Sequence, residues 1–322
     1  MNTRSSSRRD VLAALCATLA APSILRASPI QDMSGMAFGT SWRIAGTDVG
    51  GLEPLRRAVS DLFAEVDLEM SPWRADSTLS RFNTSTTGRA ASSELTHVTE
   101  AALALAQISE GAFDPTVGPL VARWGFGPIT DGAVADWRGV SVTEGWLSKT
   151  DSDLTLDLCG IAKGRALDRA ARLARDQGLT DALLDLGGEF RALGRHPEGR
   201  DWRIAVEHPV TGHPTDMVLH LPAGMAVATS GLGVQSYGRN GQLWGHIMDP
   251  ATAHPVAGRL RSVTVLAKDA MTADGWATAL FAAGDDGGPA LARVQDISAI
   301  FLFEDGQTLR RTDTGGIREV LG

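Results

Sequence analysis

The sequence predicts an α+β fold: a single compact domain with mixed sheets, flanking helices and a cleft. Segments with helical spacing and segments with strand character both occur, but they do not alternate as regularly as in a doubly wound sheet. No linker of biased composition divides residues 30 to 322. We therefore expect residues 29–322 to form one domain.

The first half supplies one strand, two helices and a long loop. Alternating residues at Phe38, Thr40, Trp42 and Ile44 predict a strand. Apolar residues then recur at helical spacing after Pro54, so a helix is predicted there. Proline suits the first turn of such a helix. A second helix is expected at 96–109. The loop 111–128, rich in glycine and proline, is long enough to suggest a functional role.

The second half is expected to begin with a strand from Leu154, a glycine turn and a helix that continues to Gln177. The LDL triplets at Leu156 and Leu184 suggest neighbouring strands, although they are too short to indicate a duplication. Further strands are predicted at 182–186, 202–206, 217–221 and 263–267, and a helix at 271–283.

Composition limits the classes of partner. The 322 residues are 43% hydrophobic and 21% charged, as in an ordinary globular protein with one large core or two modest ones. The net charge is −8, and residues 1–28 hold four arginines and one aspartate, which leaves −11 on the remainder. So acidic a body disfavours nucleic acid and anionic lipid as partners.

Residues 1–28 are predicted to be a twin-arginine export signal, and its removal would leave a periplasmic protein; a peripheral membrane association stays open. Arg8 and Arg9 precede the apolar stretch 11–21, which is too short to span a bilayer, and small residues follow it. An amphipathic or unstructured start is the alternative. Only Cys159 then remains in the mature chain, so no internal disulfide forms, and we expect Cys159 to be a packed small residue.

The segment LTLDLCGIAKGRALDRA, from Leu154, has the layout of a phosphate site. An apolar strand would deliver Asp157 to an edge, and Gly160 and Gly164 would let the backbone approach a ligand. The free amides of the new helix would face that ligand, and Lys163 adds a positive charge. A plain strand-to-helix connection is the alternative, because the spacing does not match GxxxxGK[ST].

Two further positions could carry chemistry. Asp274 and Thr278 lie four residues apart on a predicted helix, so their oxygens project from one face and could hold Mg²⁺. A solvated aspartate with a threonine bonded to its own helix is the alternative. His246, in GHIMDP, lies close to Asp249 and could act as a general base near neutral pH. The other six histidines are expected to be surface or structural residues.

Seven motifs, in order, resemble the family of FAD:protein FMN transferases, the ApbE family. They are SPWRADSTLSRFN from Ser71, GAFDPTVGPLVARWGFG from Gly111, LDLCGIAKGRALD from Leu156, ALLDLGGEF from Ala182, AVATSG from Ala226, HIMDP from His246 and MTADGWATALF from Met271. The resemblance implies a flavin cleft and Mg²⁺-dependent transfer of the FMN moiety of FAD to a threonine hydroxyl of an acceptor protein, with release of AMP. An FAD pyrophosphatase and a non-catalytic flavin-binding or delivery protein are the alternatives. The implied acceptor is a flavin-carrying subunit of a membrane redox complex or a respiratory regulator.

The resemblance also assigns roles residue by residue. The metal would be held by the carbonyl of Gly160 with Asp274 and Thr278. His246 would be catalytic, and Asp249 would orient it or contact the metal. FAD would contact Phe38, Trp73, Ala112, Phe113, Asp114, Asp157 and Lys163. Phe38 replaces the methionine usual in relatives, and Ala251 and His254 stand where relatives often have arginine or glycine, which puts the flavin wall and substrate contacts in doubt.

Overall fold

The fold was obtained as a computed structural model that describes residues 30–47, 52–209, 217–233, 235–239, 242–306 and 308–322. The predicted export signal, 1–28, lies outside these residues. In the described part of the chain, no helix combines the length and apolar character needed to cross a membrane.

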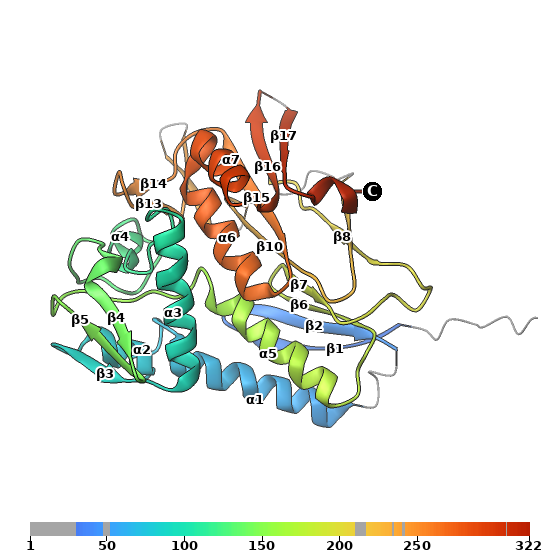
Figure 1. Ribbon diagram of the computed structural model, residues 1–322, viewed down its shortest axis with the longest axis horizontal. Coiled ribbons are helices and arrows are strands. Elements are labelled where there is room, and N and C mark those ends of the chain that lie inside the picture. Colours follow the sequence, from blue (N-terminus) through green and yellow to red (C-terminus); the bar gives the residue numbers. More distant parts are fainter. Residues whose placement is uncertain (1–29, 48–51, 210–216, 234, 240–241, 307) are drawn as a thin grey trace, which may run out of the picture.

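An eight-stranded sheet forms the centre of the molecule (Figure 1). Its strand order is β1-β2-β6-β7-β10-β15-β16-β17, and each neighbouring pair is antiparallel. The α+β class is therefore confirmed. The strands are β1 (Gln31–Ala37), β2 (Thr40–Gly46), β6 (Ala182–Leu186), β7 (Glu189–Ala192), β10 (Ala226–Gly231), β15 (Leu260–Ala267), β16 (Ser298–Asp305) and β17 (Thr308–Thr314).

Helices cover one face of this sheet and enclose the main core. Helix α1 begins with Pro54 in its first turn and buries an apolar stripe, and α6 is capped by Asp269, which accepts from the N–H of Thr272 at 2.8 Å. Helix α5 packs against both α1 and α6. The helices are α1 (Glu53–Met70), α2 (Thr78–Asn83), α3 (Ser93–Ile108), α4 (Gly118–Arg123), α5 (Ala162–Asp176), α6 (Ala270–Ala282) and α7 (Gly284–Val294), with 3-10 turns η1 (Trp137–Gly139) and η2 (Ile317–Val320).

The opposite face of the sheet packs on a second, smaller core. Side chains of β16 alternate between the two cores, with Phe301 in the main core and Ile300 and Leu302 in the second core. The hairpin of β8 (Trp202–Ala205) and β9 (Val218–Leu221) closes that second core with Trp202. Strands at 202–206 and 217–221 were expected, and both are present within a residue of their predicted ends.

Smaller sheets complete the structure. One is β3 (Gly88–Ala90), β5 (Trp146–Lys149) and β4 (Val140–Thr143), which lies with α2 and α4 at one end of the molecule (Figure 1). Two hairpins follow β10 in the chain. They are β11 (Ser236–Arg239) with β12 (Gln242–Gly245), and β13 (Met248–Asp249) with β14 (His254–Pro255).

The strand predicted from Leu154 is wrong. Residues 154–158 form no strand, because their backbone groups bond outside any ladder. Oδ1 of Asn83 accepts a hydrogen bond from the N–H of Leu156 (2.7 Å), and Nδ2 of Asn83 donates to the Leu156 carbonyl (2.9 Å). The N–H of Asp157 donates to the Pro115 carbonyl (2.7 Å). The expected pairing of the two LDL triplets is therefore absent, and β6 pairs with β2 and β7.

Two further expectations need correction. Phe38 does not continue a strand: with φ of 50° it forms, with Gly39, the tight turn between β1 and β2. The loop 111–128 is not structureless, since it contains α4, whose Pro119 suits a first helical turn.

Candidate functional site

The first turn of α5 meets the first turns of α6 at very short range because Gly164 has no side chain. A Cβ at Gly164 would lie 2.2 Å from the carbonyl oxygen of Ala270 and 2.8 Å from the Cβ of Asp274. The N–H of Gly164 donates to Oδ2 of Asp274 at 2.9 Å. Glycine is therefore required for this contact, which fixes a buried carboxylate at the start of α5.

The three predicted metal ligands lie together at this junction. Asp274 and Thr278 are one turn apart on α6, and a Cβ at Gly160 would lie 3.1 Å from Oγ1 of Thr278. Asp274 is only 4% exposed, and burial raises the pKa of its carboxyl, although the charge of Lys163 opposes this. Ser230, which the sequence did not single out, places its Oγ 3.2 Å from Oγ1 of Thr278.

This donor set suits a hard cation. In the described residues, no group of three or more His, Cys, Asp and Glu side chains gathers as a metal cluster. The set instead combines one carboxylate with a hydroxyl and a backbone carbonyl. Mg²⁺ accepts few protein oxygens and completes its octahedral shell with water or substrate phosphate, so these residues fit it.

Lys163 makes an ion pair with Glu189, the first residue of β7. Burial lowers the pKa of Lys163, but the carboxylates of Glu189 and Asp274 outweigh this effect, so its pKa is raised. The Lys163 side chain is 35% exposed, so part of it is open to solvent. A permanent positive charge thus lies next to the metal-competent oxygens.

Glu189 is a site residue that the sequence analysis missed. It is 3% exposed, and its Oε2 has no hydrogen-bond partner among the described residues. Burial raises its pKa to about 7 despite the opposing charge of Lys163. Gly187 and Gly188, with φ of 63° and 98°, form the turn that delivers it, so the GGEF motif was the available signal.

The expectation of free amides at the start of α5 is wrong. The N–H of Ala162 donates to the carbonyl of Leu158 (2.9 Å), and that of Gly164 donates to Asp274. Protein groups thus occupy most of this helix end, and the Lys163 side chain is the group that can meet an anion there.

The predicted flavin loop, 112–114, lies against the same junction. Phe113 is buried, and its ring would approach a Cβ at Gly160 to 3.2 Å, while Ala112 is half-buried. Asp114 is buried and accepts from the N–H and hydroxyl of Thr116. Burial raises the pKa of Asp114, which the two hydrogen bonds partly offset.

Asp157 connects this loop to the glycine turn. Its Oδ1 accepts from the N–H of Cys159 at 2.9 Å, and its own N–H bonds to the loop at Pro115. Cys159 is exposed, so its expected role as a packed residue is wrong. Desolvation of the thiol, together with the neighbouring Asp157 carboxylate, raises the pKa of Cys159 well above its usual value.

Two aromatic residues assigned to the flavin have different surroundings. Trp73 is 67% exposed, so it is not a core residue and its indole face is available for stacking. Phe38 is half-buried and packs edge-on against Phe63, with ring centroids 5.6 Å apart. No described contact joins either residue to Lys163 or Asp274.

His246 lies between β12 and β13, half-buried beside an aromatic group. Its ring centroid is 6.3 Å from that of Phe126, and its Nδ1 lies 3.3 Å from the Gln235 carbonyl. Burial lowers its pKa, so the imidazole is neutral near pH 7 and able to accept a proton. If Nδ1 carries the hydrogen and donates to Gln235, Nε2 is the accepting atom.

Asp249 does not orient His246 in the described residues. Its Oδ1 accepts from the N–H of Ala251 (2.9 Å) and its Oδ2 from the hydroxyl of Thr252 (2.8 Å), so both oxygens stabilise its own turn. The Gln235 carbonyl contacts the imidazole instead. Stacked pairs hold this region to the loop after α4: Trp124 with Trp244, and Phe126 with Tyr237.

The fold combines a buried carboxylate, a hydroxyl and a lysine at the α5–α6 junction with a neutral histidine between β12 and β13. Groups of these kinds suit phosphoryl chemistry with a metal. The chain belongs to the ApbE family, whose sequence model matches residues 38–301. The resemblance found in the motifs is thereby confirmed.

Relatives cover nearly the whole chain. An FAD:protein FMN transferase of Vibrio cholerae is 35% identical over an alignment of 314 positions, which covers 92% of this chain and 94% of the relative. One of Haemophilus influenzae is 32% identical, over 89% and 88% of the two chains.

Solved structures agree with this family assignment. Flavin transferase ApbE from Vibrio cholerae has a TM-score of 0.81 at 32% identity and covers 91% of this chain and 99% of its own. The apo form of Pseudomonas stutzeri flavinyl transferase ApbE has a TM-score of 0.81 at 29% identity, over 91% and 96% of the two chains.

Proposed function

We propose that this protein transfers the FMN moiety of FAD to a threonine hydroxyl of an acceptor protein and releases AMP. The observation that carries the proposal is the junction of α5 and α6, where Asp274, Thr278, Gly160 and Lys163 come together in a member of the ApbE family. The two relatives named above are FAD:protein FMN transferases, and this chain aligns with nearly the full length of each.

In this reaction the threonine oxygen attacks the phosphorus that bears the riboflavin chain. A new phosphorus–oxygen bond forms, the bridging bond of the pyrophosphate breaks, and AMP leaves with the bridging oxygen. Because a threonine hydroxyl is a weak nucleophile near neutral pH, a base must take its proton. We assign this to His246, which burial keeps neutral.

Asp274, Thr278 and the Gly160 carbonyl would hold Mg²⁺, which when bound neutralises charge on phosphate oxygens. Lys163 adds a second positive charge at the same end of α5 and would contact a non-bridging oxygen. Asp157 and the loop at Phe113 and Asp114 would position FAD, and exposed Trp73 would stack on its ring system.

The acceptor and the compartment are also proposals. A flavin-carrying subunit of a membrane redox complex, or a respiratory regulator, would present the threonine. Twin-arginine export through Arg8 and Arg9 would place the enzyme in the periplasm. Because this route carries folded proteins, the enzyme could acquire a ligand before it crosses the membrane.

The test is incubation of the purified protein, from residue 29 on, with FAD, Mg²⁺ and a candidate acceptor, followed by intact mass measurement of the acceptor. The proposal requires the acceptor to gain the mass of one FMN less one water, and requires this gain to disappear when the target threonine is replaced by alanine. Free FMN and AMP with an unmodified acceptor would instead indicate a pyrophosphatase, and bound but intact FAD a delivery protein.

A further inference from the structure

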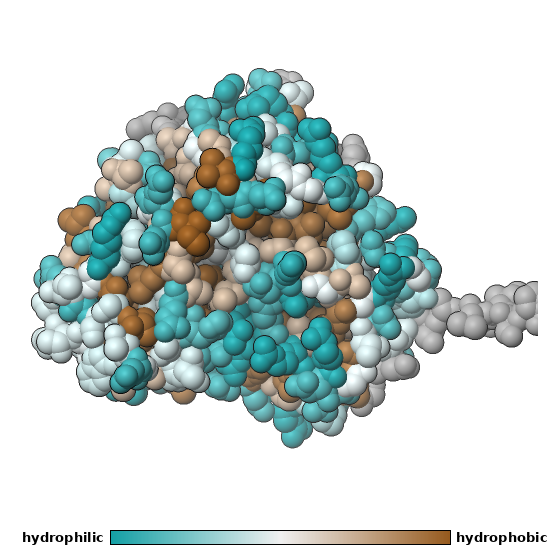
Figure 2. All heavy atoms as spheres, in the orientation of Figure 1, coloured by the Kyte–Doolittle hydropathy of each residue, from teal (hydrophilic) through white to brown (hydrophobic). Residues whose placement is uncertain are grey.

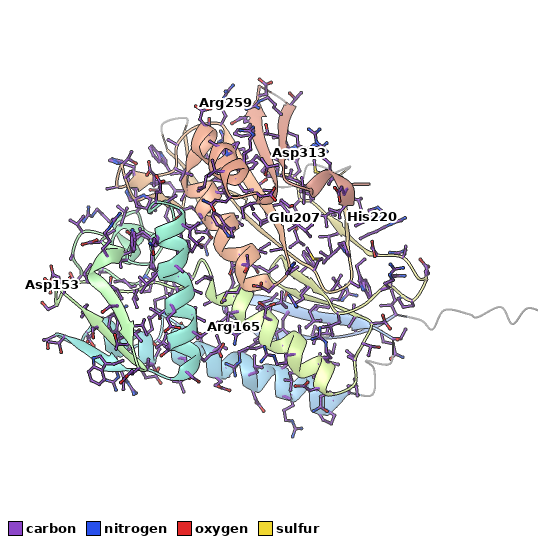
Figure 3. The ribbon with its side chains drawn as sticks, in the orientation of Figure 1. Asp153, Arg165, Glu207, His220, Arg259 and Asp313 are labelled. Carbon is purple, nitrogen blue, oxygen red and sulfur yellow. The ribbon has the colours of Figure 1, made fainter. Side chains whose placement is uncertain are left out.

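A cavity of about 330 Å³ opens on the surface where α5 meets α3, β7 and the start of α6. Four arginines line it, together with His97 and Asp168, and we call it the arginine groove. Its arginines are Arg165, Arg172, Arg175 and Arg191. Figure 3 labels Arg165 near the start of α5, and Figure 2 shows hydrophilic residues over this helix. The metal-competent residues are not among those that line it.

Two of the guanidinium groups are held in place. Arg165 donates from Nε and Nη2 to the two oxygens of Glu94, and Nη1 of Arg191 contacts Oδ1 of Asp168 (3.0 Å) and the carbonyl of Lys268 (2.8 Å). Their side chains are 17% and 14% exposed. The floor of the groove is therefore a pair of fixed, planar donors with remaining N–H groups.

The carboxylates near this floor are already engaged. Asp168 accepts from the N–H groups of Ala270 (2.9 Å) and Met271 (3.0 Å), so it caps the start of α6 as well as contacting Arg191. Asp269, also in the lining, caps the same helix through Thr272. Asp168 thus pairs with Arg191 and, with Asp269, stabilises the start of α6, while Glu94 pairs with Arg165; within the described residues none of these carboxylates pairs with Arg172 or Arg175.

The other two arginines are unengaged within the described residues. Arg172 and Arg175 are exposed on α5, and neither makes an ion pair or side-chain hydrogen bond there. From Arg165 to Arg175 the helix rises about 15 Å, at about 1.5 Å per residue. The groove thus presents two positive charges that are unpaired within the described residues, Arg172 and Arg175, next to the two paired guanidinium groups, on a body that carries −11.

The length of this row of arginines indicates the kind of ligand. A single phosphate or carboxylate reaches one or two guanidinium groups, whereas about 15 Å corresponds to four or five residues of extended chain at about 3.3 Å each. Several carboxylates spaced along one peptide would meet Arg172, Arg175 and the fixed floor together. The geometry therefore favours an acidic polypeptide over a small anion.

The groove also adjoins the candidate site. Lys163 precedes Arg165 by two residues on the same helix, and Arg191 follows Glu189 by two residues, on the same face of β7. A segment bound along α5 would thus hold a partner next to the site while leaving Asp274 and Thr278 open to FAD.

We propose that the arginine groove docks an acidic segment of the acceptor protein. This inference rests on the proposed function for the identity of the partner, but the binding of an acidic peptide can be measured without any turnover. Such an electrostatic site would accelerate encounter and choose among acceptors more than it would alter chemistry.

The binding test uses fluorescein-labelled hexaglutamate and fluorescence anisotropy at low ionic strength. The wild-type protein should bind the peptide, and Arg172→Glu/Arg175→Glu should bind it at least about 10-fold more weakly, because two attractive charges become repulsive. The control is Arg57→Glu/Arg293→Glu, which changes the net charge equally at exposed helical positions outside the groove. Binding should weaken with added NaCl in the wild type and the control.

Equal affinity in the wild type and the groove variant, or no binding to the wild type, would overturn the proposal. Displacement of the peptide by an equal concentration of inorganic phosphate would also overturn it, since that indicates a single-anion site. Thermal melting of both variants verifies that they are folded.

A kinetic arm then separates this inference from the proposed function. In the flavin transfer assay the groove variant should raise the KM for acceptor about 10-fold, with the KM for FAD unchanged. Absence of transfer by the wild type would refute the proposed function, but the peptide-binding measurement could still be interpreted. Wild-type transfer with an unchanged acceptor KM in the groove variant would refute the groove alone.

Discussion

Glu189 provides the sharpest test of the electrostatics at the site, because its pKa is raised from 4.5 to about 7 by burial. Between these pH values the folded protein keeps a proton that the unfolded chain has lost, so the free energy of unfolding must fall as pH rises. At about 1.4 kcal/mol per pH unit, the group lowers stability by about 3 kcal/mol over this window. In Glu189→Gln the side chain stays neutral throughout and this loss disappears.

We therefore expect Glu189→Gln to match the wild type near pH 4.5 and to exceed its stability by up to about 3 kcal/mol at pH 7 and above. The measurement is urea unfolding at a series of pH values in buffer with a metal chelator. Glu100→Gln, on the exposed surface of α3, is the matched control and should show no such trend. A difference between Glu189→Gln and the wild type that does not change with pH would refute the assigned electrostatics.

Four other predictions address the roles of single residues. Asp274→Ala should abolish Mg²⁺-dependent turnover, while the protein should stay folded and should still bind FAD, although more weakly than the wild type. Full transfer activity of this variant would contradict the role of Asp274 in metal binding. His246→Asn should slow single-turnover transfer by about 10² to 10⁴ with FAD affinity retained, and wild-type activity should fall as acid protonates the imidazole; a normal saturated rate would exclude the base. Trp73→Ala should weaken FAD binding about 2- to 12-fold through lost stacking, as measured by flavin fluorescence, and unchanged affinity would remove it from the flavin site. Replacing Arg8 and Arg9 by lysine should leave an active precursor in the cytoplasm, and undiminished periplasmic protein would show that the export signal was misread.

Local sequence patterns predicted the elements that depend on their own periodicity. Helix α6 was expected at 271–283 and occurs at Ala270–Ala282, and β6 occurs at its predicted residues. The spacing of Asp274 and Thr278 correctly placed two oxygens on one helical face, because that geometry is set within a single turn. The motifs also identified the family.

Long-range contacts explain what the sequence did not reveal. The run at 154–158 reads as a strand, but Asn83, more than 70 residues away, takes the hydrogen bonds of Leu156. The first amides of α5 seemed free, but Gly164 donates to a carboxylate 110 residues later. Neither partner can be inferred from local composition.

Burial is the second quantity that one sequence does not provide. Glu189 follows a glycine turn like many exposed residues, and only the packing of α5 against β7 makes it a buried partner of Lys163. The reverse holds for Cys159, which lies in an apolar run but is exposed beside the site. Asp249 is close to His246 in sequence, yet its own turn engages both of its oxygens.

The central claim is that the α5–α6 junction transfers FMN and does not simply cleave FAD. The most direct measurement is the ratio of AMP released to FMN covalently bound to an acceptor, in one reaction with FAD and Mg²⁺. We predict equal amounts of the two products with the wild type and neither with Asp274→Ala. AMP released in excess, with free FMN in solution and an unmodified acceptor, would contradict the claim.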